Sequence, residues 1–303
     1  MMTDPVTENT LWRRLRDGKT GPIVVIVAAL ILAWYAGAIY LNTPWQIEVF
    51  ERAEQDWTAV DLVRETWSQK RPVLPSPHQV FEELYISVFT FKPTSKRSLL
   101  YHAGVTASST LLGFLFGSLL GIILAVGIVH NRTLDHSLLP WVITSQTIPI
   151  LAIAPMIIVV LGAIGLKGLI PKAIISTYLC FFPVTIGMVK GLRSPDPLQR
   201  DLMRTYSASD NQVFWKLRVP CSTPFLFTSL KIAAASSLVG AIVGELPTGA
   251  QAGIGARLLA GSYYGQTTQI WSALIMGSLM AALFVTAIAV VEKRVVGRMG
   301  LRA

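Results

Sequence analysis

Long apolar stretches dominate the hydrophobic pattern of the chain. A helix needs about 20 mostly apolar residues to cross roughly 30 Å of hydrocarbon. Six stretches approach or exceed that length, at 22–41, about 104–129, 139–163, 169–191, 223–246 and 270–291. The pattern therefore predicts an all-α integral membrane protein with about six transmembrane helices.

Basic residues cluster in three segments between or beyond these stretches, whereas segment 42–98 is nearly balanced in charge. The three basic segments are the N-terminal segment 1–21, the loop 192–222 with its preceding Lys190, and the tail 293–303. With six spans, all three segments lie on one side, which the positive-inside rule makes cytoplasmic. We therefore expect both termini in the cytoplasm, a first transmembrane helix at 22–41, and a core of five helices at 104–292.

The segment 42–103 is expected on the opposite side. Within it, "LPSPHQVFEELYISVF" begins with proline punctuation and then places apolar residues at helical spacing, among them Val80, Leu84 and Val88. This pattern predicts an amphipathic helix, either on the outer membrane surface or as an ordinary solvated loop helix.

Composition supports a membrane protein. The hydrophobic fraction is 52%, the charged fraction is 14% and the mean hydropathy is +0.53. The excess of 26 basic over 17 acidic residues fits cytoplasmic loops better than nucleic-acid binding. Cys180 and Cys221 suggest neither a disulfide nor a metal site. The glycine-rich stretch "TGAQAGIGARLLAGS" lacks the nucleotide-binding pattern, and no catalytic or metal-ligating set is apparent.

The polar stretch 200–220 stands apart from the apolar spans. Ser194-Pro195 predicts a helix start, and Ser209 with Gln212 has the spacing of a capping box. We expect two short helices joined at 207–209, the second ending before Pro220. Their apolar side chains favour a cytosolic protein partner. A DNA-reading helix-turn-helix is disfavoured by the tethering to membrane spans, and a loop lying on the lipid surface is the remaining alternative.

This stretch, "DLMRTYSASDNQVFWKLRVP", resembles the cytoplasmic loop of ATP-binding cassette importer permeases. Asp201 stands where the family has Glu, Leu202 and Met203 replace two Ala, and Ser207 replaces a Gly. The stretches "LPSPHQVFEEL", "TSQTIPILAIAPMIIVVLG" and "GAIVGELPTGAQAGIGARLLAGSYYGQTTQIWSAL" resemble the permease subfamily that serves sulfonates, taurine, nitrate and pyrimidine-like compounds. The resemblance covers residues 74–292.

The resemblance implies a complex in the bacterial inner membrane. A second permease subunit, identical or homologous, completes the pathway, two ATP-binding subunits hold ATP and Mg, and a periplasmic binding protein delivers the solute. This chain itself would bind no cofactor. The loop would couple the ATPase to the spans through Asp201, Leu202, Met203, Tyr206, Ser207, Ala208 and Ser209.

Several polar or helix-breaking residues within the predicted spans are candidates for the pathway or its gate. A carboxylate near membrane depth is costly unless it is paired or wetted, so Glu245 is the leading one; a salt bridge to Arg257 is the alternative. The others can equally serve as helix–helix hydrogen-bond partners. They are Thr144, Gln146, Pro149, Ser236 and Ser237.

Two further classes of function are disfavoured by the sequence. A stand-alone secondary transporter would show inverted repeats, which the sequence lacks, and a membrane enzyme would need clustered catalytic residues. For the solute, the stretch from Gly244 to Thr267 favours a pyrimidine-like or other heterocyclic compound, with a sulfonate, taurine or nitrate as the alternative.

Overall fold

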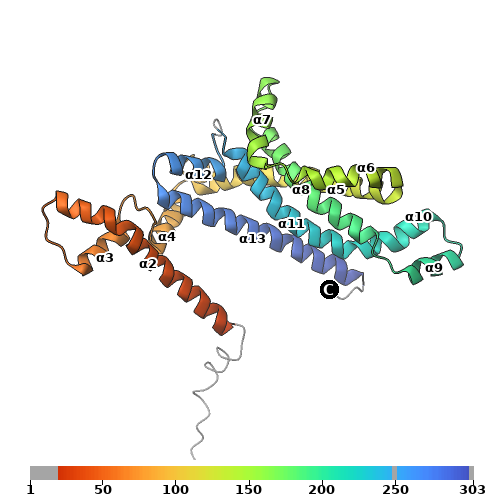
Figure 1. Ribbon diagram of the computed structural model, residues 1–303, viewed down its shortest axis with the longest axis horizontal. Helices are drawn as coiled ribbons and strands as arrows, with labels where there is room; N and C mark the ends of the chain where they lie inside the picture. Colours follow the sequence, from red (N-terminus) through yellow and green to blue (C-terminus); the bar gives the residue numbers. More distant parts are fainter. Residues whose placement is uncertain (1–19, 248–250, 300–303) are drawn as a thin grey trace, which may run out of the picture. The chain divides into compact units, whose positions relative to one another are not determined.

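The computed structural model describes residues 20–247 and 251–299, and it contains no strand in that part of the chain (Figure 1). The basic residues at 13–19 and Arg302, expected from the sequence on the cytoplasmic side, lie outside the described residues. The helices are α2 (Thr20–Arg52), α3 (Ala59–Ser68), α4 (Pro77–Tyr85), α5 (Leu99–His130), α6 (Arg132–Ser145), α7 (Ile150–Ala163), α8 (Leu169–Leu192), α9 (Pro197–Thr205), α10 (Asp210–Val213), α11 (Val219–Glu245), α12 (Ile254–Tyr263) and α13 (Thr267–Arg298), with π-helical turns at Ile86–Thr90 and Phe214–Arg218.

The all-α membrane architecture is confirmed. Among the described residues, five helices are long and apolar enough to cross a membrane, and the bent pair α6–α7 makes a sixth span if counted as one. The span predicted at 139–163 corresponds to this pair, whose two helices meet at 97°. Pro149 has no N–H to bond the preceding turn and disfavours helical geometry at Ile148, so α6 ends and α7 starts afresh.

The chain divides into two compact units. The first comprises the residues up to Ile86 together with Gly261–Ser272. Its organising side chain is the buried amide of Asn42, which donates to Leu74 O at 2.9 Å and accepts from the N–H of Val73 at 2.8 Å. The indole of Trp34 donates to Pro75 O at 3.0 Å. These bonds fix the chain that leads into α4, where the sequence predicted a helix.

The second unit comprises Ser87–Ala260 and the chain from Ala273 onward. Its centre is the packing of α5, α8 and α11, which lie side by side in Figure 1. The closest approaches use small residues: Gly113, Gly117 and Gly121 of α5 face α8 at intervals of four. A methyl group on Gly113 would come within 2.3 Å of the Ser176 side chain. Small residues therefore set the spacing of these helices, as is common in membranes.

The helix after the predicted bend differs from the expectation. It was predicted to end before Pro220, but Asp210–Glu245 forms one continuous helix of 36 residues. The π-helical turn at Phe214–Arg218 precedes the proline, and the N–H of Val219 bonds Phe214 O. A wide turn at this point accommodates Pro220, which lies in the first turn of α11 and has no backbone N–H to donate to the preceding turn.

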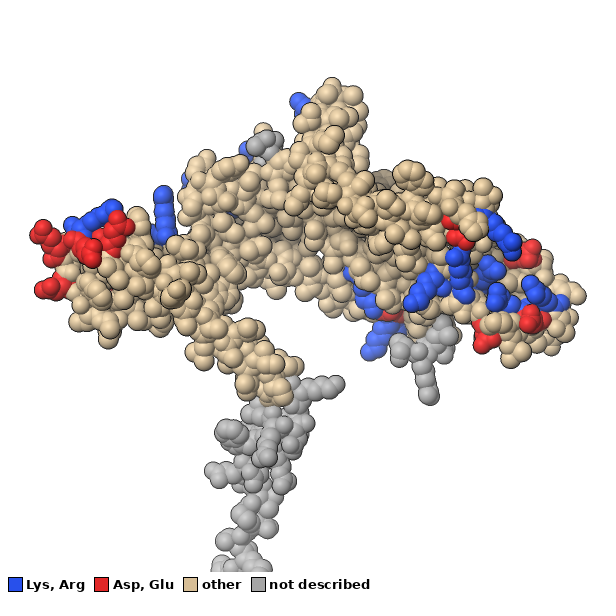
Figure 2. Space-filling view, in the orientation of Figure 1, with Lys and Arg blue, Asp and Glu red and all other residues tan. Residues whose placement is uncertain are grey.

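Basic side chains gather over α9 and α10 and near the end of α13 (Figure 2). Arg193 pairs with Asp135 at 2.7 Å, which joins the end of α8 to α6. Lys231 pairs with Glu292 at 2.8 Å and links α11 to α13. The second unit is therefore cross-linked by ion pairs at its basic end.

Candidate functional site

The first N–H groups of α12 are capped by side chains from two other helices. The first four N–H groups of a helix have no partner within it and need acceptors when they are buried. Each acceptor here comes from α5 or α11. The bonds run from Gly253 N to His102 Nδ1 (3.0 Å), from Ile254 N to Thr106 Oγ1 (2.8 Å) and from Gly255 N to Glu245 Oε2 (2.9 Å).

The Glu245 carboxylate lies at the centre of this cap and is fully buried. The Thr106 hydroxyl donates to it at 2.9 Å and 3.0 Å while accepting from Ile254. The Lys172 ammonium lies 3.6 Å from Oε1. A buried carboxylate is tolerated only when it is paired and hydrogen-bonded, and Glu245 meets both conditions.

His102 adds a second connection. Its Nδ1 accepts from Gly253, so the hydrogen-bond network assigns the ring proton to Nε2, which donates to Lys96 O at 2.9 Å. The imidazole thereby joins the start of α5 to the start of α12.

Glycine is required where the chain passes the carboxylate. Gly253 has a φ of +127°, and a Cβ there would lie 2.1 Å from the Glu245 Cδ. A Cβ on Gly255 would lie 2.3 Å from Ile242 O. The G-I-G of the sequence is therefore a close-approach motif, consistent with the interpretation that it is no nucleotide-binding loop.

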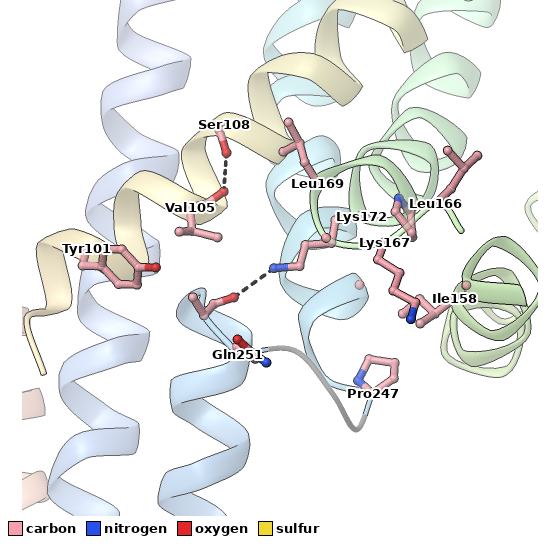
Figure 3. A pocket seen from close by; sticks show the side chains of 15 residues that line it. Tyr101, Val105, Ser108, Ile158, Leu166, Lys167, Leu169, Lys172, Pro247 and Gln251 are labelled. Atoms are coloured by element: carbon pink, nitrogen blue, oxygen red, sulfur yellow. Dashed lines mark hydrogen bonds between the residues drawn. The ribbon is translucent and has the colours of Figure 1, made fainter. Parts of the chain in front are cut away.

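A cavity of about 700 Å³ adjoins the cap (Figure 3). Its walls come from α5, α7, α8, the end of α11 and the chain before α12. Lys172 extends from α8 and donates to Ala252 O at 2.9 Å, so it contributes to both the cap and the cavity wall.

The residues predicted for the pathway fall in three separate places. Thr144, Gln146 and Pro149 occupy the break between α6 and α7, where the Thr144 hydroxyl bonds Pro140 O of its own helix. Ser237 is buried between helices, and its carbonyl accepts from Ser176. Ser236 is half-buried beside it. Glu245 sits in the cap, where Thr106 and Gly255 donate to its carboxylate and Lys172 lies 3.6 Å away.

The residues predicted for coupling lie together on a protruding turn. Leu202 and Tyr206 are 56% and 78% exposed, and Asp201 makes a solvated pair with Arg204 at 3.5 Å. Met203 and Ala208 are half-buried. Ser207 adopts a left-handed φ of +52°, and Ser209 caps α10 through the predicted box with Gln212. The first short helix begins at Pro197 with Asp196 as its cap, two residues later than predicted.

Comparison with known proteins identifies the family. Residues 117–300 match the family described as "Binding-protein-dependent transport system inner membrane component". The chain belongs to this family. It is therefore a multi-pass permease of the inner membrane and a transport subunit, and ATP hydrolysis falls to a partner subunit.

Individual relatives support the same assignment. A probable ABC transporter permease protein of Haemophilus influenzae is 31% identical over 204 residues, covering 67% of this permease and 78% of the relative. The formylaminopyrimidine transport permease of Halalkalibacterium halodurans is 31% identical over 183 residues, covering 60% and 68%. The riboflavin transport system permease of Chloroflexus aurantiacus is 30% identical over 191 residues, covering 61% and 65%.

Sequence reasoning missed most of the cap of this permease. His102 and Thr106 are four residues apart on one face of α5, and neither they nor Lys172 was among the predicted site residues. A detectable signal was the pair of glycines at 253 and 255, which follows a carboxylate and starts a helix. The sequence pattern only excluded a nucleotide-binding loop there, because two of the acceptors, His102 and Thr106, lie 151 and 148 residues from the groups they bond.

Replacing Thr106 with Val is expected to destabilise the permease. The substitution keeps the shape of the side chain but leaves the Ile254 N–H without its acceptor and removes one hydrogen-bond donor from Glu245, which costs about 1–3 kcal/mol. Thr110→Val is the matched control, since its hydroxyl bonds only Thr106 O within its own helix. We expect a clearly lower thermal unfolding midpoint for Thr106→Val than for Thr110→Val in purified protein. Equal midpoints would contradict the cap as a stabilising element.

Proposed function

We propose that this permease carries a small heterocyclic solute, pyrimidine-like in character, delivered by a periplasmic binding protein. The observation that supports this solute class is the order of sequence identity among the relatives. Those named for formylaminopyrimidine and riboflavin are 31% and 30% identical, whereas those named for aliphatic sulfonates and nitrate are 23% and 25% identical. A sulfonate, taurine or nitrate is the second candidate. The proposed complex has two ATP-binding subunits, which hold ATP and Mg, and a second permease subunit, identical or homologous.

The segment 192–222 is proposed as the site where the ATPase docks. Leu198, Leu202 and Tyr206 are spaced by four residues and form one face of α9, and all three are exposed. Such a face on a nine-residue helix is unstable alone in water and gains stability when a partner covers it. The bend at Ser207–Ser209 is rigid, because its backbone is held by Met203 O and by the α10 cap.

The pathway residues are proposed to act at two levels. Gln146 and its neighbours lie where a membrane span is broken, and irregular backbone at that depth is tolerated only against protein or a water-filled cavity. Glu245 acts at the other level by holding the chain before α12, and so shapes the outer end of the pathway. Ser236 and Ser237 fit the packing role better, since Ser237 lies within a helix interface.

Orientation is the first testable consequence. With the basic end cytoplasmic, Ser68 and Thr205 lie on opposite sides of the membrane. Single cysteines introduced at these positions, in a background with Cys221→Ser and the buried Cys180 retained, should react with an impermeant thiol reagent from opposite sides of sealed vesicles. Labelling of both from one side would contradict the orientation.

Ala208→Arg tests the docking turn. A long cation at this half-buried position places an unpaired charge in the proposed interface, which costs several kcal/mol, and each 1.4 kcal/mol is tenfold in affinity. We expect normal membrane insertion but at least tenfold less co-purified ATPase subunit. His136→Arg is the control, an exposed change at the start of α6. Full assembly and transport with Ala208→Arg would exclude the turn as the docking element.

The solute class is tested on the cognate binding protein. Titration calorimetry with uracil, thymine, riboflavin, taurine and nitrate should give a dissociation constant for a heterocycle at least 100-fold below those for taurine and nitrate, because a site built for ring hydrogen bonds leaves its polar groups unpaired with the wrong solute. Tightest binding of taurine or nitrate would favour the second candidate.

A further inference from the structure

The cavity beside the α12 cap contains a charged side chain that the cap alone does not explain. Lys172 is 8% exposed and lines the cavity of about 700 Å³. Among the described residues, its ammonium makes one hydrogen bond, to Ala252 O. The nearest carboxylate oxygen, on Glu245, is 3.6 Å away and is already bonded by Thr106.

An ammonium has three N–H donors, and a buried one is stabilised when all are used. Lys172 therefore retains donor capacity on the wall of a cavity. Because Glu245 lies 3.6 Å away and balances its charge, a bound group need not be an anion. An oxygen acceptor is sufficient, either a neutral carbonyl or one oxygen of a carboxylate or sulfonate.

The remaining walls of the cavity are mainly apolar. Val105, Ile158, Leu169 and Pro247 contribute aliphatic surface, and Tyr101 contributes a ring (Figure 3). Ser108 also lines the cavity, but its hydroxyl is engaged with Val105 O at 2.7 Å. Lys167 and Gln251 also line the cavity, and a mostly apolar pocket with a small number of polar groups is typical of a small-molecule site.

We propose that this cavity is a solute subsite of the permease, in which Lys172 binds an acceptor oxygen of a small solute whose apolar or aromatic body contacts α5, α7 and α8. The proposal rests on the transport function above and adds a binding residue within a single subunit. The same ammonium holds Ala252 O, so a bound solute would lie beside the bond that tethers the chain before α12.

The subsite is tested with thiol reagents of opposite charge, which serve as the small-molecule probes. Ser108→Cys is introduced with Cys221→Ser, in the complete transporter in maltoside detergent. Reaction rates are measured for 2-sulfonatoethyl methanethiosulfonate and for its trimethylammonioethyl counterpart. The sulfonate reagent is expected to react about tenfold faster, because Lys172 stabilises its oxygens close to the thiol. Ethanesulfonate at millimolar concentration should slow that reaction.

Further variants test whether Lys172 causes the difference between the two reaction rates. Lys172→Met with Glu245→Gln removes both charges and should reduce the rate ratio to about one, whereas Lys172→Arg should keep the preference. Lys167→Met is the matched control. Lys167 lines the same cavity but is exposed and extends toward Ile158 in Figure 3, so its loss should change the ratio by about twofold or less.

Three outcomes overturn the subsite: equal rates for the two reagents, a preference that survives in the double variant, or protection by phosphatidylglycerol nanodiscs without protection by ethanesulfonate. The last would assign the cavity to a lipid headgroup. Co-purification of the ATPase subunit is measured in the same preparation, so a failed subsite with an assembled ATPase leaves the proposed function standing. Loss of the ATPase in the unmodified transporter would count against the function itself.

Discussion

A buried carboxylate constrains the arrangement of the second unit. Glu245 has no exposed surface, and a charge in such a place is stable only if surrounding groups replace its water. Those groups come from distant parts of the sequence: the Thr106 hydroxyl from α5, the Lys172 ammonium from α8 and the Gly255 N–H from the start of α12. The carboxylate therefore has all its hydrogen-bond and ion-pair partners only when these three elements are in place. The buried charge thus favours this one arrangement of the helices over others.

Close helix packing is what allows the groups to meet. A Cβ on Gly244 would lie 3.2 Å from the Lys172 Cα, and one on Gly240 would lie 2.7 Å from the Ser176 Cα, so α11 and α8 are nearly in backbone contact. In lipid there is little hydrophobic drive between helices, and small residues let dispersion and hydrogen bonds act at short range. The spacing imposed by these glycines brings Lys172 into reach of both Glu245 and Ala252. The cap is therefore a consequence of the packing, and larger residues at 240 or 244 would move its partners apart.

The sequence predicted the features that depend on local pattern. The apolar stretches predicted the spans, and Ser209 with Gln212 predicted the start of α10. It failed where the outcome depends on backbone adjustments or distant partners. Pro149 lies at a break within the predicted span and caps α7, whereas Pro220 stays inside a continuous helix, because a π-helical turn absorbs the missing N–H. Glu245 was recognised as unusual, but its Thr106 partner is 139 residues away, and no periodicity connects the two.

The continuity of Asp210–Glu245 gives the permease a physical connection between its two ends. This helix of 36 residues is about 54 Å long at 1.5 Å per residue, and it starts beside the proposed docking turn. Its last residue is the carboxylate of the cap. A predicted break at Pro220 would have separated these ends by a flexible joint, whereas an unbroken helix transmits a displacement with little loss. In the proposed coupling, a movement imposed at Ser209 by a partner would shift Glu245 relative to Thr106 and Lys172, and the bonds of the cap would be the discrete contacts that such a shift breaks and remakes.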